Sequence, residues 1–158
     1  MNKKNSIFAI MFIIRAYGIL RRESSLLISK EIINSVAYTK FPGGGLEYGE
    51  GLRECIIREI EEELGLVVIG LSHIYTTDFF VASVFGPEKK QVISVYYDLT
   101  VKDLGNLLYI PDHQLVTTNE KNQHVGWIPI NALKEEDFSF PIDQYVLRLI
   151  KTKCNISH

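Results

Sequence analysis

The sequence lacks the features that mark several protein classes. Its 158 residues include only two cysteines, Cys55 and Cys154, too few for the dense disulfide framework of a small secreted protein. We therefore expect reduced thiols and a cytoplasmic location. It also lacks an excess of charge of either sign, because 17 basic residues face 19 acidic ones and the net charge is -2. Without a strong overall field, we expect neither nucleic acid nor a membrane among its partners.

Long hydrophobic runs are scarce as well. Lys3 and Lys4 precede an apolar run over residues 7–14, which is similar to the front of a secretory signal. The run is too short to span a bilayer, and no small-residue cleavage site follows it. Residues 1–12 therefore either lengthen a first strand or form an N-terminal extension. Because no repeat, low-complexity tract or linker interrupts the chain, we expect one domain over residues 1–158.

The pattern of apolar residues predicts an α+β fold. Apolar residues at helical spacing predict a helix over residues 50–64 that ends at Gly65, and Pro141 opens a second helix. Residues 102–123 have the composition of a loop. Stretches rich in Val, Ile, Tyr and Phe predict strands over residues 7–20, 26–33, 36–41 and 125–130, and a long hairpin over 67–84 and 90–101.

Glycines and glutamates cluster around the first predicted helix. Five of the eleven glycines lie between Gly43 and Gly51, which indicates a backbone that bends sharply and approaches something closely. Glu59, Glu62 and Glu63 then follow at positions i, i+3 and i+4, so they share one face of the helix. A hard divalent cation such as Mg²⁺ or Mn²⁺ would turn their mutual repulsion into attraction. The alternative is a solvated acidic face, the usual meaning of a charge run on a helix.

The glycines and glutamates together resemble the Nudix box, which reads G, five residues, E, seven residues, then R-E-U-x-E-E-x-G-U, with U aliphatic. Every fixed position matches between Gly44 and Leu66, and a chance match at one register is on the order of one in a billion. The resemblance implies a Nudix hydrolase, in which a mixed β-sheet is packed between helices as an α/β/α sandwich. It also implies hydrolysis of a diphosphate linkage with Mg²⁺ or Mn²⁺ as cofactor.

The resemblance assigns roles to residues in and beside the box. It implies that Glu59, Glu62 and Glu63 bind the metal and that the Gly43 carbonyl approaches the same cation. Glu50 would be a supporting metal ligand or a hydrogen-bond acceptor, with helix capping as the alternative role. Gly43 could be simply a tight turn. Arg58 would hold the loop and orient carboxylates. Its side chain is expected to point away from its sequence neighbour Glu59. The alternative is a surface ion pair that contributes little stability.

The general base that activates water is left open between acids inside and outside the box. Glu59 and Glu63 are the candidates within the helix. Glu120, seven residues before Trp127, is the preferred outside candidate, and Asp112 lies in the same loop. An acid in a loop is otherwise simply solvated. The residues expected to take part in catalysis are Glu59, Glu63, Arg58 and Glu120.

The substrate is expected to be a nucleotide, either a nucleoside triphosphate or a nucleotide-sugar-like diphosphate. Arg15, Lys40 and Lys30 are candidates for phosphate binding. Aromatic residues in strands usually pack within the sheet, but some could stack on a base: Tyr17, Tyr75, Phe79 and Phe80. From these groups we expect substrate contacts from Arg15, Lys40 and Phe79.

Further features bear on substrate and assembly. ADP-ribose hydrolases of this family tend to carry a proline shortly after the box, and none follows here before Pro87. A homodimer is compatible with the sequence.

Two other functions share this fold. A non-catalytic Nudix-fold nucleotide sensor or binding protein usually has an eroded box, whereas this box is complete. A prenyl diphosphate isomerase would need an additional catalytic cysteine and a longer chain. Cys55 lies on the apolar face of the predicted box helix, where packing is the simpler role.

Overall fold

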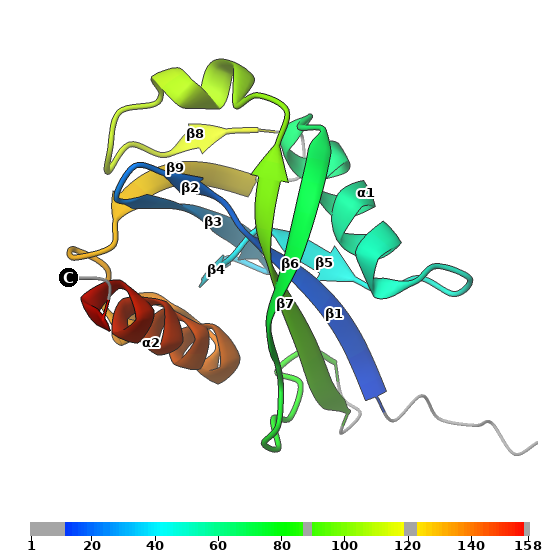
Figure 1. Cartoon of the computed structure of the whole chain (residues 1–158). Helices are drawn as coiled ribbons and strands as arrows, with labels where there is room; N and C mark the ends of the chain where they lie inside the picture. The colour runs from blue at the N-terminus through cyan, green and yellow to red at the C-terminus, as the bar shows by residue number, and fades with distance from the viewer. Residues whose placement is uncertain (1–11, 87–89, 119–122, 157–158) are drawn as a thin grey trace, which may run out of the picture.

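The computed structural model describes residues 12–86, 90–118 and 123–156 (Figure 1). Residues 1–11 lie outside this part, so the question of an extension before the first strand stays open. The first of two sheets is mixed. Its strand β1 runs parallel to β7, while the β1–β5 and β6–β7 pairs are antiparallel. In spatial order this sheet contains β5 (Gly43–Gly45), β1 (Phe12–Ile19), β7 (Gln91–Val101) and β6 (Val68–Thr76).

The second sheet is antiparallel and is organised around β3. A tight turn at Asn34 and Ser35, both with positive φ, joins β3 to β4. β9 pairs along the other edge of β3, and β8 follows it. The five strands are β2 (Arg21–Arg22), β3 (Ser25–Ile33), β4 (Val36–Lys40), β8 (Val116–Thr117) and β9 (Gln123–Pro129).

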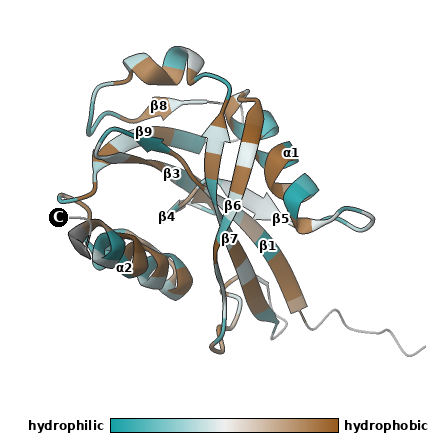
Figure 2. Cartoon of the chain, viewed as in Figure 1, coloured by the Kyte–Doolittle hydropathy of each residue, from teal (hydrophilic) through white to brown (hydrophobic). Residues whose placement is uncertain are grey.

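Helices α1 (Leu52–Leu64) and α2 (Pro141–Ile156) lie on opposite sides of the strands (Figure 1). Both helices alternate hydrophobic and hydrophilic residues, as Figure 2 shows, and each buries its apolar face. Leu27 belongs to the core cluster that includes the apolar residues of α1, whereas its neighbours Leu26 and Ile28 belong to the cluster of α2. Alternate residues of β3 therefore face opposite helices. The predicted α+β class and its sandwich of strands between helices are confirmed.

The structure differs from the predicted elements in three places. The strands form two sheets rather than one. The strand predicted over residues 67–84 ends at Thr76. The Thr77 amide still donates to the Ser94 carbonyl, but the Ser94 amide donates to Thr77 Oγ1 instead of to a main-chain carbonyl. Pairing returns only at the isolated Ala82–Gln91 bridge. The predicted loop over residues 102–123 contains a 3₁₀ helix, Gly105–Tyr109, and the short β8.

The glycine turn reaches α1 through a close approach of two backbones. β5 pairs with β1 so that Gly43 lies opposite Tyr17. Gly43 has a φ of 133°, and a Cβ atom there would lie 2.2 Å from the Ala16 carbonyl oxygen, so only glycine fits. α1 then begins after Gly51 and ends at Gly65, whose left-handed φ of 67° agrees with the predicted cap.

The described residues contain no helix that could span a membrane. Across residues 12–86, 90–118 and 123–156, none combines the length and the hydrophobicity that crossing a bilayer requires.

Candidate active site

The three box glutamates of α1 lie together on the wall of one cavity of about 470 Å³. The glycines of β5 form another part of this wall, so main-chain carbonyls and carboxylates face the same space. We call it the carboxylate cavity. Its lining residues are Arg15, Glu31, Lys40, Gly43, Gly44, Gly45, Glu59, Glu62, Glu63 and Gln123.

Glu59 depends on the absence of a side chain at Gly44. A Cβ atom on Gly44 would lie 2.3 Å from Glu59 Oε1 and 2.6 Å from Oε2. The carboxylate therefore occupies the space that any larger residue would fill. The box glycine and the box glutamate form one packing unit, although fourteen positions separate them in the sequence.

Glu63 and Lys40 hold the glycine turn from two sides. The Gly43 amide donates to Glu63 Oε2 at 3.0 Å, and Lys40 Nζ donates to the Gly43 carbonyl at 3.0 Å. Lys40 Nζ is also 3.3 Å from Glu31 Oε2 and 3.9 Å from Glu63 Oε1. Burial raises the pKa of Glu63 even though Lys40 opposes the shift. For Lys40, burial acts to lower the pKa, but the charges of Tyr17, Glu63 and Glu31 outweigh it and raise the pKa.

Arg58 joins the loop to the carboxylates. Its Nε and Nη2 atoms donate to the two carboxylate oxygens of Glu50 at 3.0 and 2.7 Å, and Nη2 also donates to the Gly45 carbonyl at 3.1 Å. Its Nη1 atom donates to Glu59 Oε1 at 3.1 Å and to Glu62 Oε2 at 3.3 Å. The expectation that Arg58 points away from Glu59 was wrong, because the arginine side chain is long enough for Nη1 to reach Glu59. The Glu62 side chain, one turn further along, leans toward the helix N-terminus and meets the same nitrogen.

Glu50 lies just before the first turn of α1, not within it. It accepts from Arg58 and from the Glu47 amide at 2.8 Å, and the Arg58 hydrogen bond lowers the pKa of Glu50 to about 2. The amide of the N-cap residue Gly51 is satisfied instead by Glu54, at 2.6 Å. Glu50 does not line the carboxylate cavity. Its position fits a hydrogen-bond acceptor that supports the loop, and not a helix cap.

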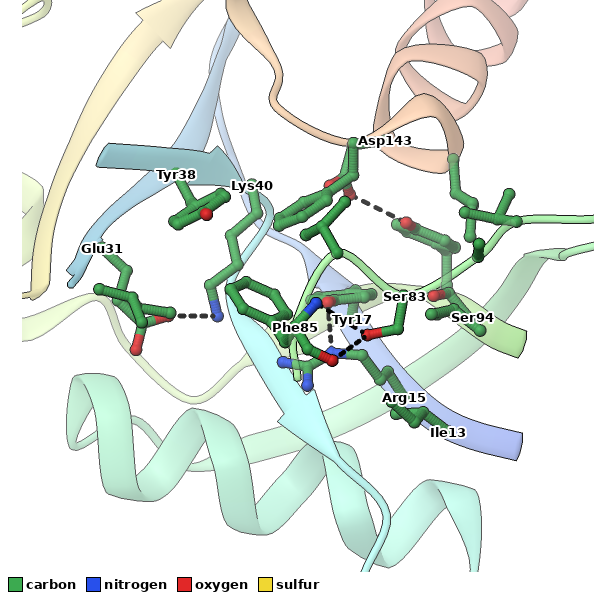
Figure 3. Close-up of a pocket in the computed structure, with 18 residues that line it drawn as sticks. Ile13, Arg15, Tyr17, Glu31, Tyr38, Lys40, Ser83, Phe85, Ser94 and Asp143 are labelled. Carbon is green, nitrogen blue, oxygen red and sulfur yellow. Dashed lines mark hydrogen bonds and ion pairs between the residues drawn. The ribbon is translucent and has the colours of Figure 1, made fainter. Parts of the chain in front are cut away.

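A second cavity, of about 360 Å³, adjoins the first. The two share Arg15, Glu31 and Lys40 as lining residues. Aromatic rings line it, among them Tyr38 and Phe85 (Figure 3). The Tyr38 and Phe140 rings are stacked with centroids 5.6 Å apart at 3°, and the Phe85 ring lies 5.1 Å from that of Tyr38. We call it the aromatic cavity. Its other lining residues are Ile13, Tyr17, Ile33, Val81, Ala82, Ser83, Val84, Val92, Ser94, Tyr96, Ile142 and Asp143.

Asp143 is an acid of the aromatic cavity that was not predicted from the sequence. It lies in the first turn of α2 and is 1% exposed. Its Oδ1 atom accepts from the Tyr96 hydroxyl at 2.9 Å, whereas Oδ2 is buried without a hydrogen-bond partner among the described residues. Burial outweighs the Tyr96 hydrogen bond and raises the pKa of Asp143 to about 7. Asp143 and the buried Val146 are three residues apart, so they share one face of α2. That spacing could have predicted that Asp143 is buried.

We expect Asp143 to make folding stability depend on pH. Its pKa is higher in the folded chain than its ordinary value of 3.8, so its contribution is complete below pH 3.8 and is lost as pH rises toward 7. The difference between the two pKa values, 3.8 and about 7, corresponds to about 4 kcal/mol in the free energy of unfolding. Thermal unfolding of the wild type and of Asp143→Asn at pH 5, 6, 7 and 8 measures it, and the wild-type midpoint should fall more steeply. Parallel curves for the two proteins would contradict the assignment.

The remaining predicted residues lie in different surroundings. Arg15 lines both cavities and its Nε donates to the Tyr17 hydroxyl at 2.6 Å. Phe79 lines neither cavity and packs edge-on against Tyr145, with ring centroids 5.9 Å apart. Glu120 lies outside the described residues. Cys55 is fully buried, and burial raises the pKa of its thiol to about 12, which agrees with a packing role.

The donor set of the carboxylate cavity suits a hard cation, because it consists of carboxylate and main-chain carbonyl oxygens. In the described part of the chain, no three His, Cys, Asp or Glu side chains already form a metal site. The reason is visible in the contacts, since Arg58 engages Glu59 and Glu62, while Lys40 and the Gly43 amide engage Glu63. A divalent cation would therefore have to replace some of these donors.

Several solved structures share this arrangement of strands and helices. A MutT structure from work on Aliivibrio salmonicida and Vibrio cholerae is 21% identical, with a TM-score of 0.62 over 89% of this chain and 98% of that one. The MutT NUDIX hydrolase of Burkholderia pseudomallei is 14% identical, with a TM-score of 0.61 over 88% and 98%. The E. coli ORF135 protein is 19% identical, with a TM-score of 0.63 over 90% and 91%. These likenesses show the fold.

Family membership follows from the sequence match. The family model of the NUDIX domain matches residues 11–149, which is most of the chain. No curated protein matches the chain. Within the matched range lie the complete box and the cavity that its glutamates line. The chain therefore belongs to the NUDIX family of pyrophosphohydrolases.

Proposed function

We propose that this enzyme hydrolyses a diphosphate linkage in a nucleotide, with Mg²⁺ or Mn²⁺ bound in the carboxylate cavity. The substrate is a nucleoside triphosphate or a nucleotide-sugar-like diphosphate. One observation carries the proposal: the carboxylate cavity and the aromatic cavity adjoin each other and share Arg15, Glu31 and Lys40. A diphosphate in the first can thus be joined to a flat base in the second, whose volume suits a small-molecule site.

The base would lie among the rings of Tyr38, Phe85 and Phe140, which offer both stacking and edge contacts. Asp143 would read its polar edge, since Oδ2 is buried in the cavity wall without a hydrogen-bond partner among the described residues. With a pKa of about 7, Asp143 can either donate or accept a hydrogen bond near neutral pH. A heterocycle, which carries hydrogen-bonding groups on its edge, fits a cavity that combines aromatic rings with such a carboxyl group.

The diphosphate would lie along the face formed by Glu59, Glu62 and Glu63, which are the proposed metal ligands together with the Gly43 carbonyl. When bound, a divalent cation supplies charge neutralisation at the phosphate oxygens and lowers the pKa of the attacking water. Glu59 or Glu63 would take the proton from that water, with Glu120 as the outside alternative. Arg58 would keep the loop and carboxylates in register, because it contacts both.

The test is product release from a panel of nucleoside triphosphates, nucleotide sugars, ADP-ribose and dinucleoside polyphosphates, with Mg²⁺, with Mn²⁺ and with EDTA. We expect one class to be turned over and EDTA to abolish that turnover. Phe140→Ala should raise the KM of that class by about tenfold while leaving kcat nearly unchanged. The base is the only part of the substrate that the Phe140 ring would contact. Val84→Ala, a smaller change on the wall of the same cavity, is the matched control.

Binding of a nucleotide without turnover anywhere in the panel would refute the hydrolytic proposal and would favour a nucleotide sensor on the same fold. Turnover that persists in EDTA would contradict the part of the proposal that concerns the metal. We further propose a single domain, a cytoplasmic location and small nucleotides as partners, with neither nucleic acid nor membrane. The free thiols of Cys55 and Cys154 support the location.

A further inference from the structure

We propose that the Lys40 ammonium is a resident cation of the carboxylate cavity. It competes with a divalent cation for the Gly43 carbonyl and Glu63, and it moves to a phosphate oxygen when a nucleotide binds. The inference rests on the proposed function only for its second half. The first half concerns the protein and the cation alone.

The position of Lys40 is that of a bound ion. Its side chain is only 4% exposed, and a lysine so deeply buried needs charged or polar partners on several sides. Nζ lies 3.0 Å from the Gly43 carbonyl oxygen, 3.3 Å from Glu31 Oε2 and 3.9 Å from Glu63 Oε1. The Tyr17 ring adds a cation–π contact at 5.9 Å. Figure 3 shows the Lys40 side chain turned toward Glu31 at the wall of the aromatic cavity.

Two of the oxygens that hold Lys40 are oxygens that the proposed metal would use. A divalent cation placed at the Gly43 carbonyl and Glu63 would lie within a few ångströms of the ammonium, where like charges repel strongly because solvent is largely excluded. Either the ammonium or the divalent cation can have these ligands in full. With Lys40 in place, the cavity should therefore bind divalent cations more weakly than its three carboxylates alone would.

A phosphate offers Lys40 another partner. Lys40 lines both cavities, so a phosphate chain that joins a base in one to a reacting group in the other would pass its side chain. The ammonium is a compact charge on a flexible stem and can turn toward such an anion. Its departure would free the Gly43 carbonyl and Glu63 for a divalent cation. Nucleotide and cation would then favour each other's binding through this one side chain.

The first arm of the test measures Mn²⁺ binding without nucleotide, from the loss of the electron paramagnetic resonance signal of free Mn²⁺. Lys40→Met and Lys40→Gln both remove the charge, and glutamine keeps a donor for the Gly43 carbonyl. We expect each to bind Mn²⁺ at least about tenfold more tightly than the wild type. Lys30 was a candidate for phosphate binding, but it lines neither cavity. Lys30→Met removes the same charge from β3, so its Mn²⁺ affinity should match the wild type.

The second arm measures binding of an α,β-methylene nucleotide in EDTA. We expect Lys40→Met to weaken this metal-free binding about tenfold, because a phosphate contact is lost. Structural damage would weaken both ligands, whereas the proposal requires opposite changes from one substitution. Circular dichroism confirms folding, and Lys40→Gln serves if Lys40→Met does not fold.

Unchanged or weaker Mn²⁺ binding in the neutral variants would overturn the competition. Nucleotide binding that is insensitive to Lys40 would overturn the movement to phosphate. If the wild type binds Mn²⁺ but no nucleotide at all, the proposed function fails while the first arm still decides the competition.

Discussion

Replacing both Glu62 and Glu63 with glutamine should lower metal-dependent turnover by at least about a hundredfold while the chain remains folded. Both carboxylates lie on the wall of the carboxylate cavity, and an amide keeps their shape but removes the charge that attracts a cation. The measurement is kcat at saturating Mg²⁺ with the substrate that the panel identifies. Thermal unfolding of the same protein shows whether the fold survives.

Glu61→Gln is the matched control for this pair. Glu61 lies on the same helix, is exposed and does not line the cavity. The substitution therefore removes one glutamate charge from α1 without changing the wall of the cavity. Its turnover should stay within about twofold of the wild type, as for most exposed substitutions. Full turnover by the double variant at saturating metal would refute the assignment of these glutamates as ligands.

Gly44→Ala should separate activity from stability. Its Cβ atom would lie 2.3 Å from Glu59 Oε1, so the carboxylate must leave its position. Because the displaced group is the end of a flexible side chain, the thermal midpoint should fall by only a few degrees, about 1 kcal/mol or less. Turnover should fall by about a hundredfold, since Glu59 is both a proposed ligand and a proposed base.

Gly45→Ala provides the comparison one residue further along β5. A Cβ atom there meets nothing within 4 Å, so both turnover and stability should stay close to the wild type. Steady-state kinetics and thermal unfolding of the two variants, side by side, are the measurement. Wild-type turnover in Gly44→Ala would show that the position of Glu59 does not matter for catalysis.

The acidic face of the site could be predicted from sequence because its geometry is local. Glu59, Glu62 and Glu63 lie on one helix, whose period alone determines that they share a face. Gly44 and Arg58 belong to the same short segment, and the box fixes their spacing. Even here one local prediction was wrong. Neighbouring positions on a helix point in different directions, so Arg58 was expected to avoid Glu59, but the arginine side chain is long enough to reach the Glu59 carboxylate.

The aromatic cavity could not be predicted in the same way because its residues are distant in sequence. Tyr38 stacks on Phe140 across about one hundred positions, and nothing in the local pattern of either strand or helix indicates that pairing. Phe79 was expected to contact the substrate, and the strand was expected to run through residue 84. Since the strand ends at Thr76, the loop beyond it turns Phe85 toward the cavity and leaves Phe79 against Tyr145. The division into two sheets likewise depends on long-range pairing.

The two adjoining cavities differ in how they are built, and this difference has an evolutionary consequence. One continuous segment supplies the glycine turn and the carboxylates, so its parts must change together. The aromatic cavity draws its residues from β1, β3, β4, the loop after β6, β7 and the start of α2. The residues that line this cavity alone, such as Tyr38, Phe85 and Phe140, can be replaced without disturbing α1, so a lineage can acquire a new substrate by separate substitutions while it keeps the same chemistry.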